Sequence, residues 1–567
     1  MPRPLIRPLL VFMSLVSLAI PRTTAAPPAF QRGAVATVQR IATDAGVQAL
    51  REGGNAVDAA VVAGLVLGVV DGFNSGIGGG CLMLIHAPDG TLTAIDGRET
   101  APAAASRDMY LVDGHADAAR SRTGPLAVAT PGQVAAFHDA VTAFGRLPWA
   151  YHCRLAARVA AEGFVISDHY AARLASVRDD LARFDGSREI FLRPDGSPLA
   201  AGDRLVQPDL AGSLGALADG GPDWFYRGPL ATRVGDWMAA HGGILTAADF
   251  AGYRALRREP LVGRYRRWSV VGFPPPSSGG IHVAQMLGML ERFDLATLGP
   301  DSDTFRHVVA EAMKRAFADR VRWLGDADFV AVPRGLLDRD YLAARSADID
   351  PDRAVPVAAA GEPPSAAADV FPSTKHTTHV SAADADGWWV ACTSTVNTTF
   401  GSKVVVPGTG IVLNNEMDDF VAEPGARNAF GLVGGDANAI AAGKRPLSSM
   451  SPTLVLEDGR PVLAVGAAGG PTIISQVLLA VIHTLDFGAD PEAALSRPRF
   501  HHQWSPDRLR LERRAGPDSG AGLSARGHDV ETVDSIGAST LVTQPLADGP
   551  FSGAAEPRLA EAAIGGL

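Results

Sequence analysis

The sequence predicts an α+β protein whose helices dominate the first part of the chain and whose strands dominate the last part. Residues 41–51 have the apolar spacing of a helix, and residues 303–322 form another long helical stretch. Residues 56–70 are almost wholly apolar, so a helix there must be buried on all sides. From Thr377 onward the pattern changes to that of strands.

A glycine-rich stretch, residues 75–80, lies between the apolar helix and a predicted strand at residues 81–86. A phosphate-binding loop needs the order strand, glycines, helix, and here that order is reversed. We therefore interpret these glycines as positions where two backbones pack closely. A second strand, residues 91–96, completes a hairpin and ends at Arg98 and Glu99.

The composition limits the classes of partner and cofactor. The chain has 567 residues, of which 47% are hydrophobic and 20% charged, as in ordinary globular proteins. Its net charge of -10 argues against nucleic acid as a partner, because phosphate binding requires a basic surface. Three cysteines without a CxxC motif support neither a disulfide framework nor a zinc site. Since His501 and His502 are too closely spaced for a recognisable metal site, we predict no metal and no other cofactor.

Residues 1–26 have the features of a secretory signal. Arg3 and Arg7 precede an apolar core at residues 9–20, and small residues follow at 23–26. This core is too short to span a membrane, and no other stretch is long and apolar enough. We expect an exported protein, periplasmic or secreted, without a stable membrane span.

Thr377 is the candidate nucleophile. It follows a Pro/Ala-rich stretch, residues 348–373, which is the best linker candidate in the chain. A threonine hydroxyl needs a neighbouring base, and cleavage of the chain before Thr377 would free an α-amino group for that role. Such an amine has a pKa of about 7.7–8.0, so it accepts a proton near neutral pH.

A turn at residues 384–387 folds the strand that starts at Thr377 back on itself. A two-residue loop would place Thr377 opposite Ser394, whereas a three-residue loop would place it opposite Thr395. The sequence leaves both registers open. Asn397 is expected two residues beyond Thr395, on the same face of the strand.

An acidic corner follows this hairpin. Residues 410–413 are predicted as a strand that leads to Glu416 and Asp419. Residues 420–438 are rich in glycine and are predicted as a long loop, and long loops in compact domains are often functional lids.

Two glycines mark the end of a later strand. Residues 453–457 and 461–466 are predicted as a strand pair, and a helix is predicted to begin near Thr472. Gly469 and Gly470 lie between the second strand and this helix. Backbone N–H groups at such a position can form an oxyanion hole.

With these pieces in place, the chain resembles the γ-glutamyltranspeptidase family over nearly all of its length beyond the signal. The matching stretches are residues 53–60, 75–80, 98–99, 274–280, 377–379 (Thr-Thr-His), 395–401 (Thr-Val-Asn-Thr-Thr-Phe-Gly), 413–420 and 445–453. Members of this family are N-terminal-nucleophile hydrolases with an αββα sandwich, made as self-cleaving proenzymes. The resemblance implies a large subunit, residues 27–376, and a small catalytic subunit, residues 377–567, that build the sandwich jointly.

The resemblance also implies the chemistry. The cut would fall between His376 and Thr377, and Thr377 would then attack the γ-carbonyl of a glutamyl donor such as glutathione. Water, or an amino acid or peptide acceptor, would resolve the acyl-enzyme. Thr395 matches the threonine that bonds the nucleophile, and Gly469 and Gly470 match the oxyanion donors.

The resemblance assigns the substrate's two charged ends to separate groups. The residues that match the α-carboxylate receptors are Arg98, Ser448 and Ser449, and those that match the α-amino receptors are Asn397, Glu416 and Asp419. A zwitterion requires such an arrangement, because a buried charge without a partner costs several kcal/mol.

The sequence departs from the family at four places around the site. Gly97 stands where an aromatic residue is usual, Ala467-Ala468 replaces Ser-Pro, Val380 replaces Tyr or Phe, and Phe430 replaces the tyrosine of many bacterial lids. These departures bear on rate and acceptor preference rather than on reaction type.

Two other functions remain open. An acylase of the same fold, acting on glutaryl or cephalosporin-type amides, would not need the α-amino site formed by Glu416 and Asp419. A non-catalytic exported binding protein would not need Thr377, Thr395 or the glycine pair. Neither a GxSxG nor an HExxH motif is present to support a serine hydrolase or a zinc peptidase.

Overall fold

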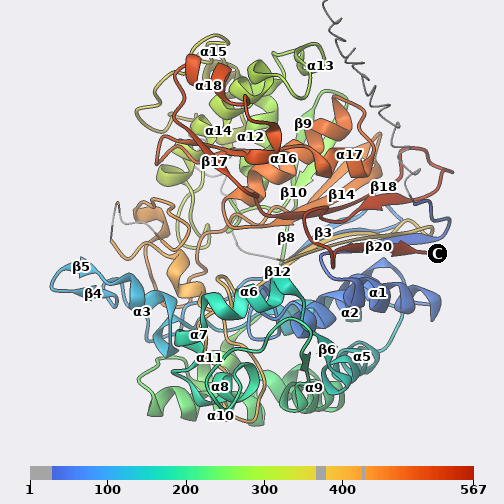
Figure 1. Cartoon of the computed structure of the whole chain (residues 1–567), viewed down its shortest axis with the longest axis vertical. Helices are drawn as coiled ribbons and strands as arrows, with labels where there is room; N and C mark the ends of the chain where they lie inside the picture. The colour runs from blue at the N-terminus through green and yellow to red at the C-terminus, as the bar shows by residue number, and fades with distance from the viewer. Residues whose placement is uncertain (1–27, 365–377, 424, 426–427) are drawn as a thin grey trace, which may run out of the picture.

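Two antiparallel sheets are stacked face to face in the middle of the molecule, and helices cover the outer face of each sheet (Figure 1). This computed structural model describes residues 28–364, 378–423, 425 and 428–567. The predicted α+β class with an αββα sandwich is therefore confirmed. None of the helices in these ranges is long and apolar enough to cross a membrane.

Both sheets combine strands from before and after Thr377. The seven-stranded sheet has the order β20 (Ala563–Gly566), β1 (Gly33–Thr37), β11 (Thr378–Asp384), β12 (Trp389–Thr395), β2 (Gly80–His86), β3 (Leu92–Gly97) and β8 (Leu256–Arg258). The six-stranded sheet has the order β19 (Ser552–Ala554), β18 (Ala538–Thr543), β14 (Arg460–Ala468), β13 (Thr453–Glu457), β10 (Trp268–Gly272) and β9 (Leu261–Tyr265). The two segments on either side of Thr377 thus share one architecture, whereas the subunit boundary itself stays a prediction.

Helices α1 (Arg40–Arg51), α2 (Ala56–Val70) and α4 (Gln133–Phe144) pack against the seven-stranded sheet. All but one residue of α2 are buried, as its apolar sequence predicts. Asn55 caps this helix, and Asp58 completes the capping box by accepting from the Asn55 N–H. Both polar groups therefore satisfy backbone donors that burial would otherwise leave unpaired.

The six-stranded sheet is covered by α12 (Gly279–Leu290) and α16 (Thr472–Leu485), and α14 (Asp303–Trp323) packs on α12 (Figure 1). Between the sheets lies a separate apolar layer that includes Leu82, Leu84 and Ala391. Their neighbours Met83 and Ile85 point to the helix side instead. This alternation follows from the pleat of a strand, and it fixes which side chains of β11 and β12 lie between the sheets.

The glycine-rich stretch before β2 is a place of close backbone approach, as predicted. A Cβ atom on Gly78 would overlap the carbonyl oxygen of Val412, and one on Gly79 would overlap that of Thr395. The absence of side chains here lets β12 end directly against this stretch.

The predicted strand at residues 410–413 is wrong. In this segment only Val412 forms a bridge, with Val405. Gly408 and Gly410 adopt left-handed φ angles of 75° and 65°, which turn the chain away from strand geometry. Asn414 follows, and its side-chain amide donates to the carbonyls of Gly78 (2.9 Å) and Ala129 (2.8 Å) while its backbone N–H also bonds the Gly78 carbonyl (3.1 Å).

We predict that Gly79→Ala lowers the stability and shifts the end of β12. The added methyl must displace the Thr395 backbone, and such overpacking costs about 1–3 kcal/mol. Thermal unfolding should show a lower Tm than wild type. Gly212→Ala is the matched control, because a Cβ on Gly212 in α9 (Pro208–Tyr226) has no atom within 4 Å. Equal Tm values for the two variants would contradict the close approach.

Candidate active site

His376 and Thr377 lie outside the described residues, which resume at Thr378 with the start of strand β11. Thr378 pairs with Ser394, and the Asp384 N–H bonds the Trp388 carbonyl around a three-residue loop. Of the two registers left open by the sequence, the described ladder has the one expected from a three-residue loop.

The inter-sheet face of this hairpin carries polar side chains near the ends of β11 and β12. His379 lies between the hydroxyls of Thr393 (2.9 Å) and Ser381 (3.1 Å). Burial lowers the pKa of His379 to about 3, so the ring is neutral at physiological pH. Gly466 in β14 leaves room for this ring, since a Cβ there would overlap it.

Asn397 does not continue the strand face of Thr395, contrary to the expectation from the sequence. Strand β12 ends at Thr395, and Asn397 has a left-handed φ of 78°. Asparagine tolerates this conformation, which turns its N–H onto the Thr395 hydroxyl oxygen at 2.6 Å. Asn397 and Thr395 therefore lie next to each other because of a turn, and not because they share a strand face.

Gly469 and Gly470 lie where β14 ends and α16 begins, as predicted. Their φ angles are 130° and 62°, which side chains rarely adopt. The Thr472 hydroxyl donates to the Gly469 carbonyl (2.7 Å) and fixes this turn. A pair of N–H groups at a helix N-terminus suits a developing oxyanion.

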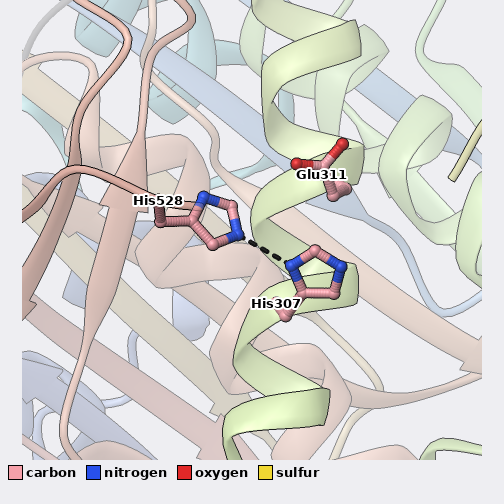
Figure 2. Close-up of side chains that lie close together, drawn as sticks. All are labelled: His307, Glu311 and His528. Atoms are coloured by element: carbon pink, nitrogen blue, oxygen red, sulfur yellow. Dashed lines mark hydrogen bonds between the residues drawn. The ribbon is translucent and has the colours of Figure 1, made fainter. Parts of the chain in front are cut away.

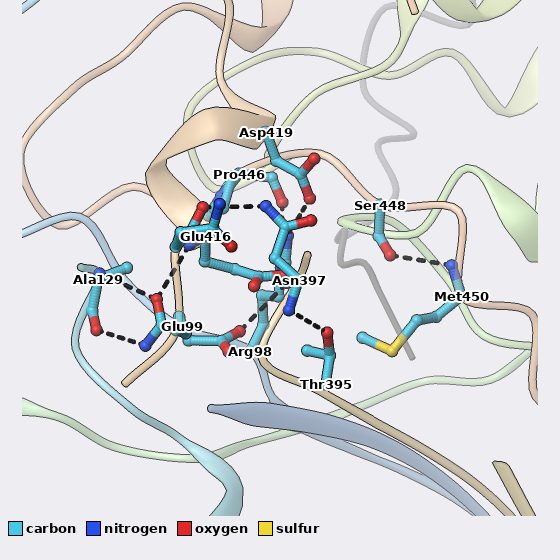
Figure 3. A network of polar contacts seen from close by, with 12 residues as sticks. Arg98, Glu99, Ala129, Thr395, Asn397, Glu416, Asp419, Pro446, Ser448 and Met450 are labelled. Atoms are coloured by element: carbon cyan, nitrogen blue, oxygen red, sulfur yellow. Dashed lines mark hydrogen bonds and ion pairs between the residues drawn. The ribbon is translucent and has the colours of Figure 1, made fainter. Parts of the chain in front are cut away.

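The Arg98 guanidinium lies at the centre of a fully buried ion-pair cluster (Figure 3). Its Nη1 atom contacts Glu99 (3.1 Å) and Glu416, and its Nη2 atom contacts Asp419 (2.9 Å). Its Nε atom donates to the Pro446 carbonyl (3.3 Å). These four contacts use four of the five guanidinium N–H donors.

This cluster, Arg98 with Glu99, Glu416 and Asp419, holds more acidic than basic groups. Burial raises the pKa of Glu99 to about 8 and that of Asp419 to about 7, against the opposing charge of Arg98. Burial raises the pKa of Glu416 as well. A cationic ligand would relieve this imbalance, because it favours the ionised form of each carboxyl.

Ser448 and Ser449 are fully buried, and Pro446, two residues before Ser448, accepts from Arg98 Nε. The Ser448 hydroxyl accepts from the Met450 N–H at 3.0 Å (Figure 3). Among the described residues, the Ser449 hydroxyl has no hydrogen-bond partner. The same holds for Asn397 Oδ1 and Glu416 Oε2, so three polar atoms of the predicted receptors remain available.

The family model of γ-glutamyltranspeptidase matches residues 42–566. The chain belongs to this family. The glutathione hydrolase proenzyme of Escherichia coli K12 is 43% identical over 553 residues, which cover 96% of this chain and 93% of that protein. The acylase ACY 1 proenzyme of Pseudomonas sp. SE83 is 38% identical, with 93% and 92% covered.

Solved structures of the family and of a related acylase have this fold. The cephalosporin acylase of Bacillus halodurans has a TM-score of 0.84 and 26% identity, and the match covers 98% of this chain and 99% of that one. The Helicobacter pylori γ-glutamyltranspeptidase has a TM-score of 0.56 and 35% identity, with 59% and 95% covered. The N-terminal-nucleophile hydrolase fold is therefore confirmed.

Three residues next to the predicted γ-glutamyltranspeptidase site were not predicted from the sequence as part of it. Glu99 was recognised only as part of a matching stretch, yet it is one of the three acids around Arg98. Arg320 on α14 lies near Asp419, and burial lowers its pKa to about 10. The Tyr253 hydroxyl donates to the Arg98 carbonyl (2.5 Å). The sequence does contain a signal for Arg320. A charged residue among the apolar residues of a buried helix is seldom buried without a partner.

Three of the four departures from the γ-glutamyltranspeptidase pattern, Gly97, Val380 and Phe430, lie in closely packed surroundings. A Cβ on Gly97 would lie 3.1 Å from Cys81 Sγ and would crowd the Ala136 methyl, so α4 occupies the space that a side chain would need. Val380 belongs to the core on the helix side of its sheet. A Cβ on Gly470 would lie 2.6 Å from the Phe430 ring, so the predicted lid residue packs on the glycine pair.

One other polar cluster has the composition of a metal site. His307 and Glu311 lie one turn apart on α14 and face His528, and the ligand atoms of this described group are within 4.8 Å of one another (Figure 2). The His307 Nδ1 and His528 Nε2 atoms are 2.7 Å apart.

The ligand atoms of this cluster already have other hydrogen-bond or ion-pair contacts. The Asp350 carbonyl bonds His307 Nε2 (2.7 Å), and the two Glu311 oxygens are held by Lys314 (2.5 Å) and Arg315 (2.8 Å). A cation would have to displace the Lys314 ammonium from Glu311. We therefore assign the cluster a structural role, in which it joins α14 to the segment before β17 (Val530–Val533).

Proposed function

We propose that this chain is a self-processing γ-glutamyltransferase and hydrolase that cleaves the γ-glutamyl bond of glutathione and related compounds. The observation that carries this proposal is the buried excess of carboxylates around Arg98. An acyl group that bears an α-amino and an α-carboxylate group matches this charge pattern, whereas a glutaryl group lacks the ammonium. Membership of the family, with glutathione hydrolase proenzymes among its relatives, supports the same substrate class.

In the proposed head-group site, the substrate ammonium lies against Glu416, Asp419 and Asn397. Its carboxylate takes the remaining N–H of Arg98 and the hydroxyls of Ser448 and Ser449. Each incoming charge thereby replaces part of an ion pair already present in the cluster. Exchange of one buried ion pair for another avoids leaving any charge unpaired.

The reaction begins with maturation. We propose that the chain is cut between His376 and Thr377, which yields a large subunit of residues 27–376 and a small subunit of residues 377–567. The new α-amine of Thr377 takes the proton of its own hydroxyl as the oxygen attacks the γ-carbonyl carbon. Thr395 orients this hydroxyl, and the N–H groups of Gly469 and Gly470 stabilise the oxyanion.

The intermediate then collapses to an acyl-enzyme. The C–N bond breaks, and the leaving amine receives the proton held by the Thr377 amine. Water or the amine of an amino acid or peptide acceptor attacks the ester, and the threonine hydroxyl is regenerated. We further propose export of the protein, on the basis of its signal-like residues 1–26.

We predict that Thr377→Ala abolishes both maturation and activity. Without a hydroxyl at residue 377, neither the chain cut nor acyl transfer has a nucleophile, and kcat should fall by at least about 10⁴-fold. Denaturing gels should show one uncut chain, of at most the 59.0 kDa of the full sequence, where wild type shows two. Thr377→Ser, which keeps a hydroxyl, should still yield two chains. If the Thr377→Ala variant still matured, a residue other than Thr377 would have to be the nucleophile.

We also predict a strong preference for γ-glutamyl-p-nitroanilide over glutaryl-p-nitroanilide. The two donors differ only in the α-amino group, and the unsatisfied buried acids should cost the glutaryl donor about 3 kcal/mol, or at least about 100-fold in kcat/KM. Steady-state rates of p-nitroaniline release by the purified protein measure the ratio. Equal or faster glutaryl cleavage would favour the acylase alternative instead.

A further inference from the structure

Lys403 occupies an unusual backbone position just after β12. It has a left-handed φ of 64°, a conformation that glycine adopts freely and that lysine seldom does. The preceding turn, which includes Phe400 (φ 56°) and Gly401 (φ 50°), is left-handed as well. The backbone here is less favourable for lysine than for glycine, so the contacts of the Lys403 side chain are of interest.

Among the described residues, the Lys403 ammonium is buried without a counter-ion. The residue is 6% exposed, and its Nζ atom donates to the Gly401 carbonyl (2.7 Å) and to the Thr398 hydroxyl (3.0 Å). Burial lowers the pKa of Lys403 to about 8, and the two described acids that act on it, Asp180 and Asp418, form their ion pairs with arginines instead. The third N–H of the ammonium is therefore available to an anion.

The acids that influence this ammonium from a distance are already engaged. Asp180 pairs with Arg183 (3.2 Å), and Asp418 accepts from the Ser121 hydroxyl (2.6 Å) and lies 3.4 Å from Arg122. Neither acid is placed to neutralise Lys403.

Lys403 lines a cavity of about 460 Å³ that reaches the predicted oxyanion glycines. Gly469, Gly470, Asn397 and Phe430 also line this cavity. Its charged lining consists of Lys403, Arg122, Arg173 and the single acid Asp180. Unlike the cluster around Arg98, this cavity is positively charged.

We propose that this cavity is the subsite for the leaving group and the acceptor, and that Lys403 binds their carboxylate. The inference rests on the proposed function, which places the γ-carbonyl at Gly469 and Gly470. The glutamyl head lies at the Arg98 cluster, so the amine beyond the scissile bond must extend toward the cavity. The ligand class is an amino acid or short peptide with a free carboxylate. Lys403 takes no proton in the reaction, because its charge only pairs with that carboxylate.

Substitution of Lys403, assayed with two donors, tests this assignment. Glutathione has a carboxylate on its leaving group, whereas γ-glutamyl-p-nitroanilide has none. In Lys403→Gln, the ratio of kcat/KM for glutathione to that for γ-glutamyl-p-nitroanilide should fall about tenfold, the loss of one charge-assisted contact. Lys403→Arg should restore most of the ratio. With acceptors, the half-saturating concentration of glycylglycine should rise about tenfold, and that of glycylglycine amide should not.

Lys444→Gln is the matched control. Lys444 is equally buried and donates to two carbonyls, of Ala437 and Ala439, but it does not line the cavity. The donor ratio should stay unchanged in this variant. An unchanged ratio in Lys403→Gln, or an equal fall in Lys444→Gln, would overturn the assignment. Wild-type protein that cleaves neither donor would instead overturn the proposed function, and this inference with it.

Discussion

The buried guanidinium of Arg98 is the constraint on which the rest of the site depends. A charge with no exposure to solvent is tolerated only when acids surround it, and here Glu99, Glu416 and Asp419 do so. Arg98 follows β3, whereas Glu416 and Asp419 belong to a short 3₁₀ turn more than 300 residues later. The cluster therefore ties the segment before Thr377 to the segment after it.

The two parts of the site have opposite charge. The cluster around Arg98 is acidic, whereas the cavity beside Gly469 and Gly470 has three basic residues, Arg122, Arg173 and Lys403, and one acid, Asp180, in its lining. In the proposed complex this separation orients an elongated donor, because its ammonium and its distal carboxylate each prefer one end. Gly469 and Gly470 line this cavity together with Asn397, and the reacting carbonyl is proposed to bind there.

Much of the fold could be predicted from local sequence signals. The apolar helix α2 and the strand β13 have the predicted bounds, since neither a continuous apolar run nor a strand bounded by turns depends on distant residues. Thr377 and the pair Gly469 and Gly470 could be predicted from local chemistry, whereas the roles of the residues around Arg98 came from the family resemblance. The location of the nucleophile, Thr377, lies outside the described residues.

Other features depended on tertiary structure. The register of the β11–β12 hairpin depends on one loop residue, and the position of Asn397 depends on a left-handed turn that the strand pattern does not reveal. The proximity of Arg320 to Asp419 results from the packing of α14. The sequence likewise gives no sign that Lys403 is buried beside a cavity.

The most direct measurement is the donor preference of an Asp419→Asn variant. If the acids around Arg98 recognise an α-amino group, the ratio of kcat/KM for γ-glutamyl-p-nitroanilide to that for glutaryl-p-nitroanilide should fall by about 10–100-fold, because a charged contact is lost only with the first donor. Asp418→Asn is the control, since its carboxylate bonds Ser121 instead, and it should leave the ratio unchanged. An equal loss of both activities in Asp419→Asn would contradict the account.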